Sequence, residues 1–173
     1  MSMDLELAHQ LADTADAIAA RFFDSGTFDV ITKADGSPVT AADLEVEETL
    51  RALIAEHRPA DGVLGEEVGP SSGLSSGPSE RRWVLDGVDG THNFVAGRAE
   101  WGTLIALEVR GEPTIGIVTS PAMARRWWAE RGGGAWTATL GRGGLGAAER
   151  LSSSATGALE GATVVAIPPA DRC

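Results

Sequence analysis

The order of hydrophobic patterns along the chain restricts its fold more than any other feature. From residue 4 to residue 24 apolar side chains recur every three or four positions, which predicts an amphipathic helix, and a second helix is expected to begin near Thr40. After Pro59 the pattern changes to short apolar runs separated by glycines, which is typical of strands. Two helices followed by a mostly antiparallel sheet predict an α+β fold with helices and sheet in layers.

Turn-forming residues set the expected boundaries of these elements. Ser25-Gly26 is expected to end the first helix, and Thr40 and Asp43 have the spacing of a capping box at the start of the second. Residues 28–31 are expected to be extended, and residues 69–79 to form a flexible surface loop. Strands are expected at residues 63–64, 83–85, 103–109, 114–118, 127–130, 135–140 and 164–167, with a hairpin around residues 111–113.

Composition limits the class of protein. The 173 residues are expected to form one domain, and no apolar run reaches the about 20 residues that cross a bilayer. The start, Met1-Ser2-Met3-Asp4, lacks the basic and apolar regions of a signal peptide. The formal net charge of −11 argues against binding to nucleic acid or to an anionic membrane. Because signal-peptide regions and a membrane-spanning run are missing from the sequence, we expect a cytoplasmic protein. The single cysteine, Cys173, cannot form an intrachain disulfide, which agrees with a reducing compartment.

Acidic residues follow two of the expected strands. Glu66 and Glu67 come after the strand at 63–64, and Asp86 and Asp89 follow the strand at 83–85. A carboxylate that faces a core unpaired is costly, so its charge must be compensated. Asp86 and Asp89 are expected to lie in a turn and to converge on one point, toward which the carbonyl of Val88 can also turn. Oxygen ligands of this kind suit Mg²⁺ or Mn²⁺ better than zinc.

Each acidic segment alone has a plainer interpretation. Asp-Gly pairs are common in surface turns, so residues 86–90 by themselves favour a solvated turn. The ordered combination of residues 33–43, 65–67 and 83–94 is what favours a metal site.

These three segments resemble the signatures of the inositol-monophosphatase superfamily. Residues 83–94, WVLDGVDGTHNF, are similar to W-[IV]-[IL]-D-P-[IL]-D-G-T-x-N-F, residues 65–67 match the GEE motif, and residues 33–43 are similar to K-x-D-x-S-P-V-T-x-A-D. Residues 97–103 and 125–129 look most like the bacterial histidinol-phosphate phosphatase branch. The resemblance runs through essentially the whole chain. It implies a layered helix–sheet sandwich and magnesium-dependent hydrolysis of a small phosphate monoester.

The resemblance also implies a role for individual residues. Those matching Glu66, Asp86 and the Val88 carbonyl hold a first Mg²⁺, and those matching Asp86 and Asp89 hold a second, among two or three ions for which Mn²⁺ is an alternative. The first ion would activate the attacking water.

Residues around the metal ligands receive the other implied roles. Asp43 and Thr91 match the pair that orients the water and takes its proton, and Glu66 shares in catalysis through the metal. The backbone N–H groups of Gly90 and Thr91 are expected to receive the phosphate, and His92 is expected to lie near the substrate. Lys33 and Asp35 match a loop with a supporting role.

The sequence departs from the family pattern in two places. Gly87 stands where the signature has proline, which is expected to loosen the turn by about 0.4–1 kcal/mol. The chain ends at Cys173 without the family's Trp-Asp motif, and Asp171 lacks that context. The resemblance therefore predicts one domain, residues 1–173, that lacks the family's C-terminal part and has weak or no activity alone. A full-length form is expected to be a homodimer.

Three alternatives for function stay open. Histidinol phosphate is the first substrate that we expect, inositol 1-phosphate is the second, and a metal-binding remnant with little activity is the third. Residues 141–146, GRGGLG, also fit the G-x-G-x-x-G fingerprint of dinucleotide-binding proteins. The segment that follows is too short and too rich in serine for a crossover helix, so we expect a hairpin connection there.

Overall fold

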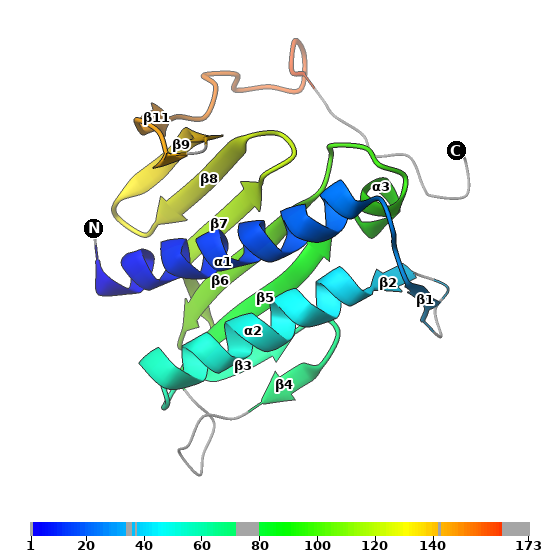
Figure 1. Cartoon of the computed structure of the whole chain (residues 1–173). Coiled ribbons are helices and arrows are strands. Elements are labelled where there is room, and N and C mark those ends of the chain that lie inside the picture. The colour runs from blue at the N-terminus through cyan, green and yellow to red at the C-terminus, as the bar shows by residue number, and fades with distance from the viewer. Residues whose placement is uncertain (1, 34–35, 37, 72–79, 142, 164–173) are drawn as a thin grey trace.

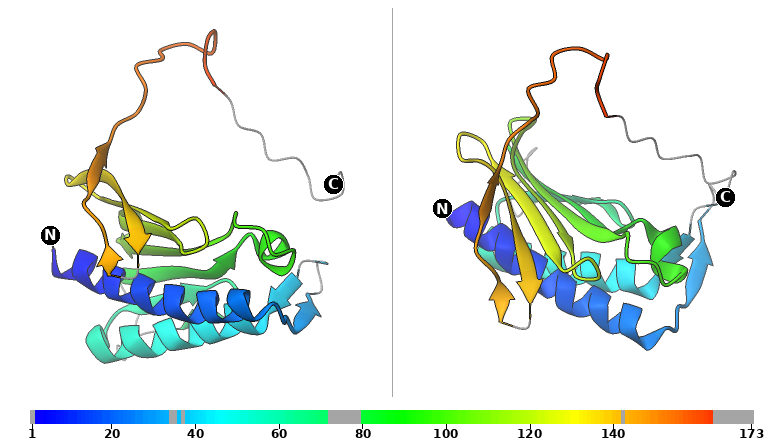
Figure 2. Two further views of the ribbon diagram at one scale, coloured as in Figure 1. Left: turned by 45° about the horizontal axis from the view of Figure 1, so that its top comes forward. Right: turned by 90° about the horizontal axis from the view of Figure 1, so that it is seen from above.

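Two long helices cover one face of a large sheet. The computed structural model describes residues 2–33, 36, 38–71, 80–141 and 143–163. Helices α1 (Met3–Ser25) and α2 (Ala41–His57) lie side by side on the sheet (Figure 1). The opposite face of the sheet carries no helix within the described ranges (Figure 2). This arrangement confirms the expected layered α+β fold.

Within the part of the chain that the structure describes, nine strands form the main sheet. Their order is β10-β9-β8-β7-β6-β5-β3-β4, and β11 also pairs with β9. Neighbouring strands are antiparallel except β3 and β5, which are parallel. The strands are β3 (Gly62–Gly65), β4 (Gly69–Ser71), β5 (Arg81–Asp89), β6 (Gly102–Val109), β7 (Glu112–Ser120), β8 (Arg125–Glu130), β9 (Gly134–Gly141), β10 (Gly144–Leu145) and β11 (Glu149–Leu151). Strands β1 (Val30–Thr32) and β2 (Pro38–Thr40) form a separate hairpin, and the short helix α3 (Thr91–Val95) follows β5.

The helix boundaries follow from their capping residues. The Ser2 hydroxyl accepts a hydrogen bond from Leu5 N, and Gly26 ends α1 in the left-handed conformation with φ 63°. At the start of α2, Thr40 and Asp43 form the expected capping box. No helix in the described part of the chain is long and apolar enough to span a membrane.

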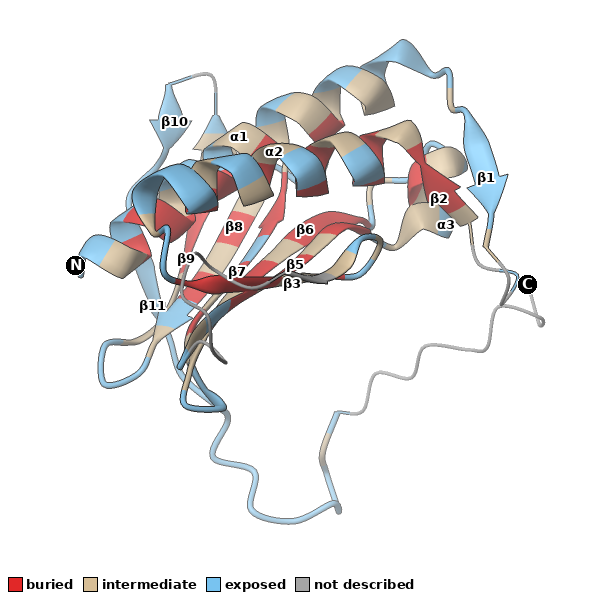
Figure 3. Cartoon of the chain, turned by 90° about the horizontal axis from the view of Figure 1, so that it is seen from below, coloured by how far each residue is buried: buried red, intermediate tan, exposed pale blue. Residues whose placement is uncertain are grey.

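The core lies between the helices and the sheet. Inward-facing side chains of β5, β6 and β7 meet the apolar stripes of α1 and α2, and Figure 3 shows this buried layer in red. An aromatic cluster at one end packs α3 against α1. Its rings belong to Phe23, Phe28, Phe94 and Trp101.

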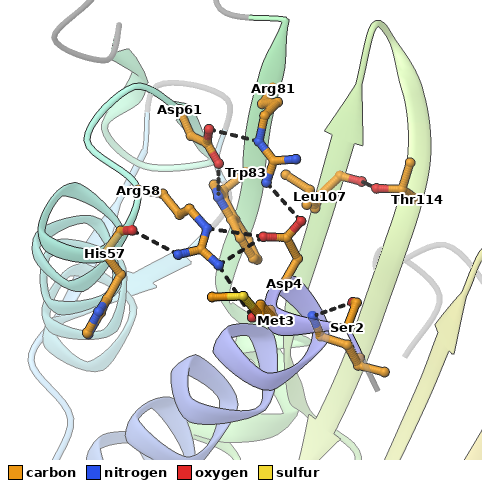
Figure 4. A network of polar contacts seen from close by, with 11 residues as sticks. Ser2, Met3, Asp4, His57, Arg58, Asp61, Arg81, Trp83, Leu107 and Thr114 are labelled. Atoms are coloured by element: carbon orange, nitrogen blue, oxygen red, sulfur yellow. Dashed lines mark hydrogen bonds and ion pairs between the residues drawn. The ribbon is translucent and has the colours of Figure 1, made fainter.

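A polar network fixes the end of β5 that lies away from the acidic residues. Asp4 of α1 forms ion pairs with Arg58 and Arg81, at 3.1 and 3.0 Å (Figure 4). Asp61 accepts hydrogen bonds from Arg81 Nε and from the indole nitrogen of Trp83, both at 2.9 Å. Because Trp83 is fully buried, this bond satisfies a polar atom that would otherwise be costly to bury.

A buried arginine ties α1 to the sheet. Arg126 of β8 is only 1% exposed and bonds Asp16 and Asp13 of α1, at 2.7 and 2.8 Å. Its Nε also donates to the Thr119 hydroxyl at 3.0 Å, and that hydroxyl lies within 2.9 Å of both Asp16 oxygens. Burial raises the pKa of Asp16, and the bonds from Thr119 and Arg126 act against this rise. The Arg126 guanidinium group therefore favours the ionised form of Asp16, which burial disfavours.

Several boundaries differ from the sequence-based expectation. Strand β5 extends to Asp89, so Asp86 and Asp89 lie in a strand, and the expected turn between them is wrong. The pairing of β5 with β6 shifts between these two aspartates, which marks a bulge. Residues 69–71, expected as loop, form β4, because they pair with β3. Residues 72–79 and the expected strand at 164–167 lie outside the described residues, as does Asp171.

Gly141, Gly144 and Leu145 of the glycine-rich segment belong to two neighbouring strands. Gly144 pairs with Gly141 and Leu145 pairs with Leu140, so β9 and β10 are antiparallel neighbours. No helix follows within the described residues, and the dinucleotide-binding alternative therefore lacks the crossover helix that it needs.

Candidate metal and catalytic site

Two parallel strands bring the predicted acidic residues to one edge of the sheet. Gly65, the last residue of β3, pairs with Leu85 of β5, and Glu66 N donates to the Leu85 carbonyl at 3.2 Å. Glu66 therefore follows β3 at the level where Asp86 continues β5. The parallel pairing, which the sequence did not predict, is what places these two carboxylates side by side.

The carboxyl group of Asp86 has a pKa far above its ordinary value. Burial, the negative charges of Glu66 and Asp89, a hydrogen bond with Glu66 and the charge of Asp43 together raise the pKa of Asp86 to about 8. Asp86 also borders a hollow of about 350 Å³ on the helix-free face, lined mainly by apolar side chains such as Val84 and Leu104. Like charges have thus gathered in a partly desolvated place, where a bound cation would relieve their repulsion.

Asp43 connects the start of α2 to the end of β5. Its side chain is buried, and Oδ2 accepts hydrogen bonds from the backbone N–H and the hydroxyl of Thr40. The Thr91 hydroxyl lies 3.4 Å from Asp43 Oδ1 and 3.0 Å from the Val88 carbonyl oxygen. Burial raises the pKa of Asp43, whereas the bonds from Thr40 and Thr91 act against this rise. The structure therefore brings Asp43, Val88 and Thr91 together.

Lys33 lies over the two glutamates. Its ammonium nitrogen is 2.6 Å from Glu67 Oε1 and 2.9 Å from Glu66 Oε1. Burial disfavours the charged ammonium group, but the hydrogen bonds to Glu67 and Glu66 outweigh this effect and raise the pKa of Lys33. Asp35, from the same predicted loop, lies outside the described residues.

The oxygen ligands of these acidic residues suit a hard cation, but their side chains are not arranged around a common point. Within the described ranges, no three His, Cys, Asp or Glu side chains form a group arranged to hold a metal ion. The donors are nevertheless carboxylate oxygens, which match the ligands that Mg²⁺ takes, and a bound cation would favour the ionised form of Asp86 that burial and the neighbouring carboxylates disfavour. Glu66 pairs with Lys33, and its side chain is 53% exposed, so metal binding would require this side chain to turn from Lys33 toward Asp86.

The predicted phosphate-binding residues follow β5 directly. Gly90 adopts the left-handed conformation with φ 81°, and a Cβ atom there would lie 3.0 Å from the Glu100 carbonyl oxygen. Thr91 begins α3, and His92 is exposed on this helix. The Asn93 side chain donates to the Glu100 carbonyl at 2.8 Å and so braces the loop that follows.

Sequence reasoning missed three residues that support these segments. Glu47 of α2 accepts hydrogen bonds from the segment after β3, and Arg51 donates to Glu47 and to the Gly69 carbonyl. The Thr103 hydroxyl donates to the Gly87 carbonyl at 2.8 Å. A signal for Glu47 was present. It lies four residues after Asp43 and interrupts the apolar stripe formed by Val46 and Leu50.

Gly87 packs directly against the first turn of α2. A Cβ atom at Gly87 would lie 2.6 Å from the Asp43 carbonyl oxygen and 3.1 Å from Asp43 Cα. The resemblance to the family signature predicts only a looser turn at Gly87, whereas the structure adds a close contact with α2.

The Gly87→Ala variant is therefore expected to be less stable by about 1–3 kcal/mol, because the helix start and the strand end must separate. Urea denaturation would measure the loss. Gly116→Ala is the matched control, since a Cβ atom at Gly116 meets nothing within 4 Å. Equal stability of the two variants would contradict this account.

Comparison with known proteins was consistent across sequence and structure. The sequence model of the "Inositol monophosphatase family" matches residues 2–168. A histidinol-phosphatase of Mycobacterium tuberculosis is 43% identical over 93% of this chain and 59% of its own length. A Streptomyces griseus protein named glucose-1-phosphate thymidylyltransferase is 49% identical over 80% of this chain and 52% of its own length. The chain thus spans about half of the length of the curated relatives that it matches.

Solved structures agree with the fold. The IMPase of Thermotoga maritima superposes with a TM-score of 0.74 at 26% identity, covering 92% of this chain and 57% of that one. An inositol monophosphatase from Zymomonas mobilis is 40% identical, with a TM-score of 0.64, over 79% of this chain and 52% of its own.

Proposed function

Because the chain belongs to the inositol monophosphatase family, we propose that it carries the metal-binding half of an enzyme that hydrolyses a small phosphate monoester with Mg²⁺. The carboxylates gathered around Asp86 are the observation that carries this proposal. At the shared edge of β3 and β5 these carboxylates disfavour each other's ionisation, and a divalent cation would remove that repulsion. Glu66, Asp86, Asp89 and the Val88 carbonyl are the groups that would hold two or three Mg²⁺ ions, or Mn²⁺ in their place.

Hydrolysis would divide its tasks among the residues at the end of β5. The bound cations supply charge stabilisation and a more acidic water. Asp43 and Thr91, already in contact, would orient that water and accept its proton as the new P–O bond forms and the ester P–O bond breaks. Backbone N–H groups of Gly90 and Thr91 would hold phosphate oxygens, with His92 beside the alcohol portion of the substrate. Lys33 and Asp35 would play a supporting part in the loop above.

Histidinol phosphate is the substrate that we propose first. The relatives from M. tuberculosis and from Streptomyces coelicolor, at 43% and 46% identity, are both named histidinol-phosphatase. Inositol 1-phosphate is the second, because a Mesorhizobium japonicum relative at 38% identity is named inositol-1-monophosphatase.

Phosphate release from a panel of phosphomonoesters would test the proposal. The panel should contain histidinol phosphate, inositol 1-phosphate and glucose 1-phosphate, each with Mg²⁺ and with EDTA. We expect Mg²⁺-dependent release, fastest from histidinol phosphate. Glucose 1-phosphate with dTTP tests the activity named for the S. griseus relative, and pyrophosphate release there without phosphatase activity would contradict the proposal.

A second candidate concerns the part of the relatives' length that this chain spans. It covers 52% to 59% of the two curated relatives described above. We therefore also consider a metal-binding module with little turnover, which a chimera carrying the remaining part of the M. tuberculosis relative would distinguish. The second candidate predicts that Mg²⁺ stabilises this chain without turnover and that the chimera is active. Equal rates for chain and chimera would exclude it.

A further inference from the structure

We propose that Glu47 is a positioning residue that holds the Gly65–Gly69 turn, and with it Glu66, at the metal site; the inference rests on the proposed function. Glu47 lies on α2 and belongs to none of the sequence segments that suggested the site. It is fully buried, which is unusual for a glutamate and calls for a specific set of partners.

The Glu47 carboxylate holds the backbone of the turn that carries the acidic pair. Glu67 N donates to Oε2 at 2.9 Å, and Val68 N donates to Oε1 at 3.0 Å. Gly65 and Gly69 pair across β3 and β4, so residues 66–68 form a three-residue hairpin turn, with Gly69 at φ 74°. Both turn N–H groups thus point toward α2, and their carboxylate acceptor makes each bond a strong one.

Close packing leaves this carboxylate little freedom. A Cβ atom added at Gly65 would overlap the carboxyl group of Glu47, so the group lies directly against the end of β3. Arg51, one helical turn further along α2, donates Nε to Glu47 Oε1 at 2.9 Å and also bonds the Gly69 carbonyl. Glu47 and Arg51 together therefore clamp the turn between its two glycines.

Helix α2 carries two buried carboxylates four residues apart, and each contacts one of the proposed ligand segments. Asp43 contacts Thr91, whose hydroxyl bonds the Val88 carbonyl, and Glu47 bonds the turn next to Glu66. Residues four apart lie on one helix face, so the helix fixes the spacing between the two segments. Loss of the Glu47 carboxylate would remove the acceptor of the Glu67 and Val68 N–H groups, so the turn that carries Glu66 would be held less firmly.

The test compares Mn²⁺ binding by the wild-type chain, Glu47→Gln and Glu48→Gln, using Mn²⁺ electron paramagnetic resonance well below each unfolding temperature. Glutamine keeps the size of Glu47, but its amide group presents one N–H₂ to a backbone donor. We expect Mn²⁺ affinity to fall by about 10–100-fold, as for other residues that orient metal ligands. Glu48 is the neighbouring residue and is exposed, so Glu48→Gln should bind as the wild type does.

A second variant covers the case in which Glu47→Gln does not fold. Arg51→Lys keeps the positive charge beside Glu47 and loses the planar group that reaches Gly69 as well. We expect a weakening of Mn²⁺ binding by about 3–10-fold, smaller than for Glu47→Gln because the carboxylate stays in place.

The outcomes separate this inference from the proposed function. Wild-type affinity in Glu47→Gln, or in Arg51→Lys where that variant alone folds, would overturn the positioning role and leave the function standing. A wild-type chain that binds no Mn²⁺ would overturn both. Weaker binding in Glu47→Gln with unchanged binding in Glu48→Gln would support the inference.

Discussion

The Asp86→Asn variant is expected to lose divalent-metal binding and yet to gain stability when no metal is present. Asp86 is ionised in the unfolded chain above its ordinary pKa of 3.8, whereas burial and then the charge of Glu66 and Asp89 raise its pKa in the fold to about 8. Ionisation thus opposes folding, and the folded state loses stability as pH rises from about 4 to about 8. An asparagine side chain does not ionise, so this destabilising effect is absent in the variant. Its advantage over the wild type should be small near pH 4 and largest above pH 8.

Bound Mg²⁺ should favour the wild type over Asp86→Asn, both in stability and in turnover. Mg²⁺ should raise the unfolding temperature of the wild type at pH 8 and leave that of Asp86→Asn unchanged. Where turnover is measurable, Asp86→Asn should lower it by on the order of 10³-fold or more, as loss of a group that stabilises transition-state charge does. Asp29→Asn, at an exposed position, is the matched control. An Asp86→Asn chain that is less stable without metal, or that Mg²⁺ stabilises as it does the wild type, would contradict this account.

The Arg126→Met variant is expected to be the most destabilising of the single substitutions considered. Methionine fills much of the buried space but leaves the carboxylate of Asp16, itself only 14% exposed, with no positive partner on β8. Removal of one member of a buried ion pair costs about 3–5 kcal/mol. Urea denaturation at pH 7 should show this loss as a lower midpoint with an unchanged slope.

Two further variants separate the lost charge from the lost contact. Arg131→Met breaks an ion pair with Glu112 whose side chains are 58% and 65% exposed, so it should cost no more than about 1 kcal/mol. Arg126→Met combined with Asp16→Asn should recover part of the loss, because no unpaired buried charge is left. If Arg126→Met and Arg131→Met were equally stable, Arg126 would not hold α1 on the sheet as described.

Local patterns predicted the elements well because local forces set them. The apolar periodicity of residues 4–24 and the capping box at Thr40 specify α1 and the start of α2 without reference to the rest of the chain. The short apolar runs between glycines that predicted strands at residues 103–109 and 114–118 likewise lie within β6 and β7. The layered α+β class followed from the order of these elements.

The features that the sequence did not predict depend on distant partners. Strand β5 continues through Asp86 to Asp89 because β6 supplies a bulged partner, and β4 exists because β3 lies beside it. The Arg126 network joins residues more than 100 positions apart, and no local pattern identifies its members.

In the candidate site, too, the motifs identify individual residues, whereas the contacts that hold them depend on distant parts of the chain. The motifs named Asp43, Glu66, Asp86 and Thr91, and the structure places these residues near one another at the edge of β3 and β5. What holds them there was not visible in the motifs. Gly65 and Gly87 matter because α2 lies against them, and Glu47 matters because its carboxylate reaches the turn after β3. The roles of the predicted site residues stay predictions until a metal is located.

The most direct test of the account is an anomalous difference map from crystals of the chain grown with Mn²⁺. The account predicts a peak within coordination distance of the carboxylates of Glu66 and Asp86 and of the Val88 carbonyl, with Asp89 beside it. It also predicts that Glu66 has left Lys33. A map in which Mn²⁺ binds elsewhere, while Glu66 and Asp86 contact only protein and water at saturating Mn²⁺, would contradict the central claim.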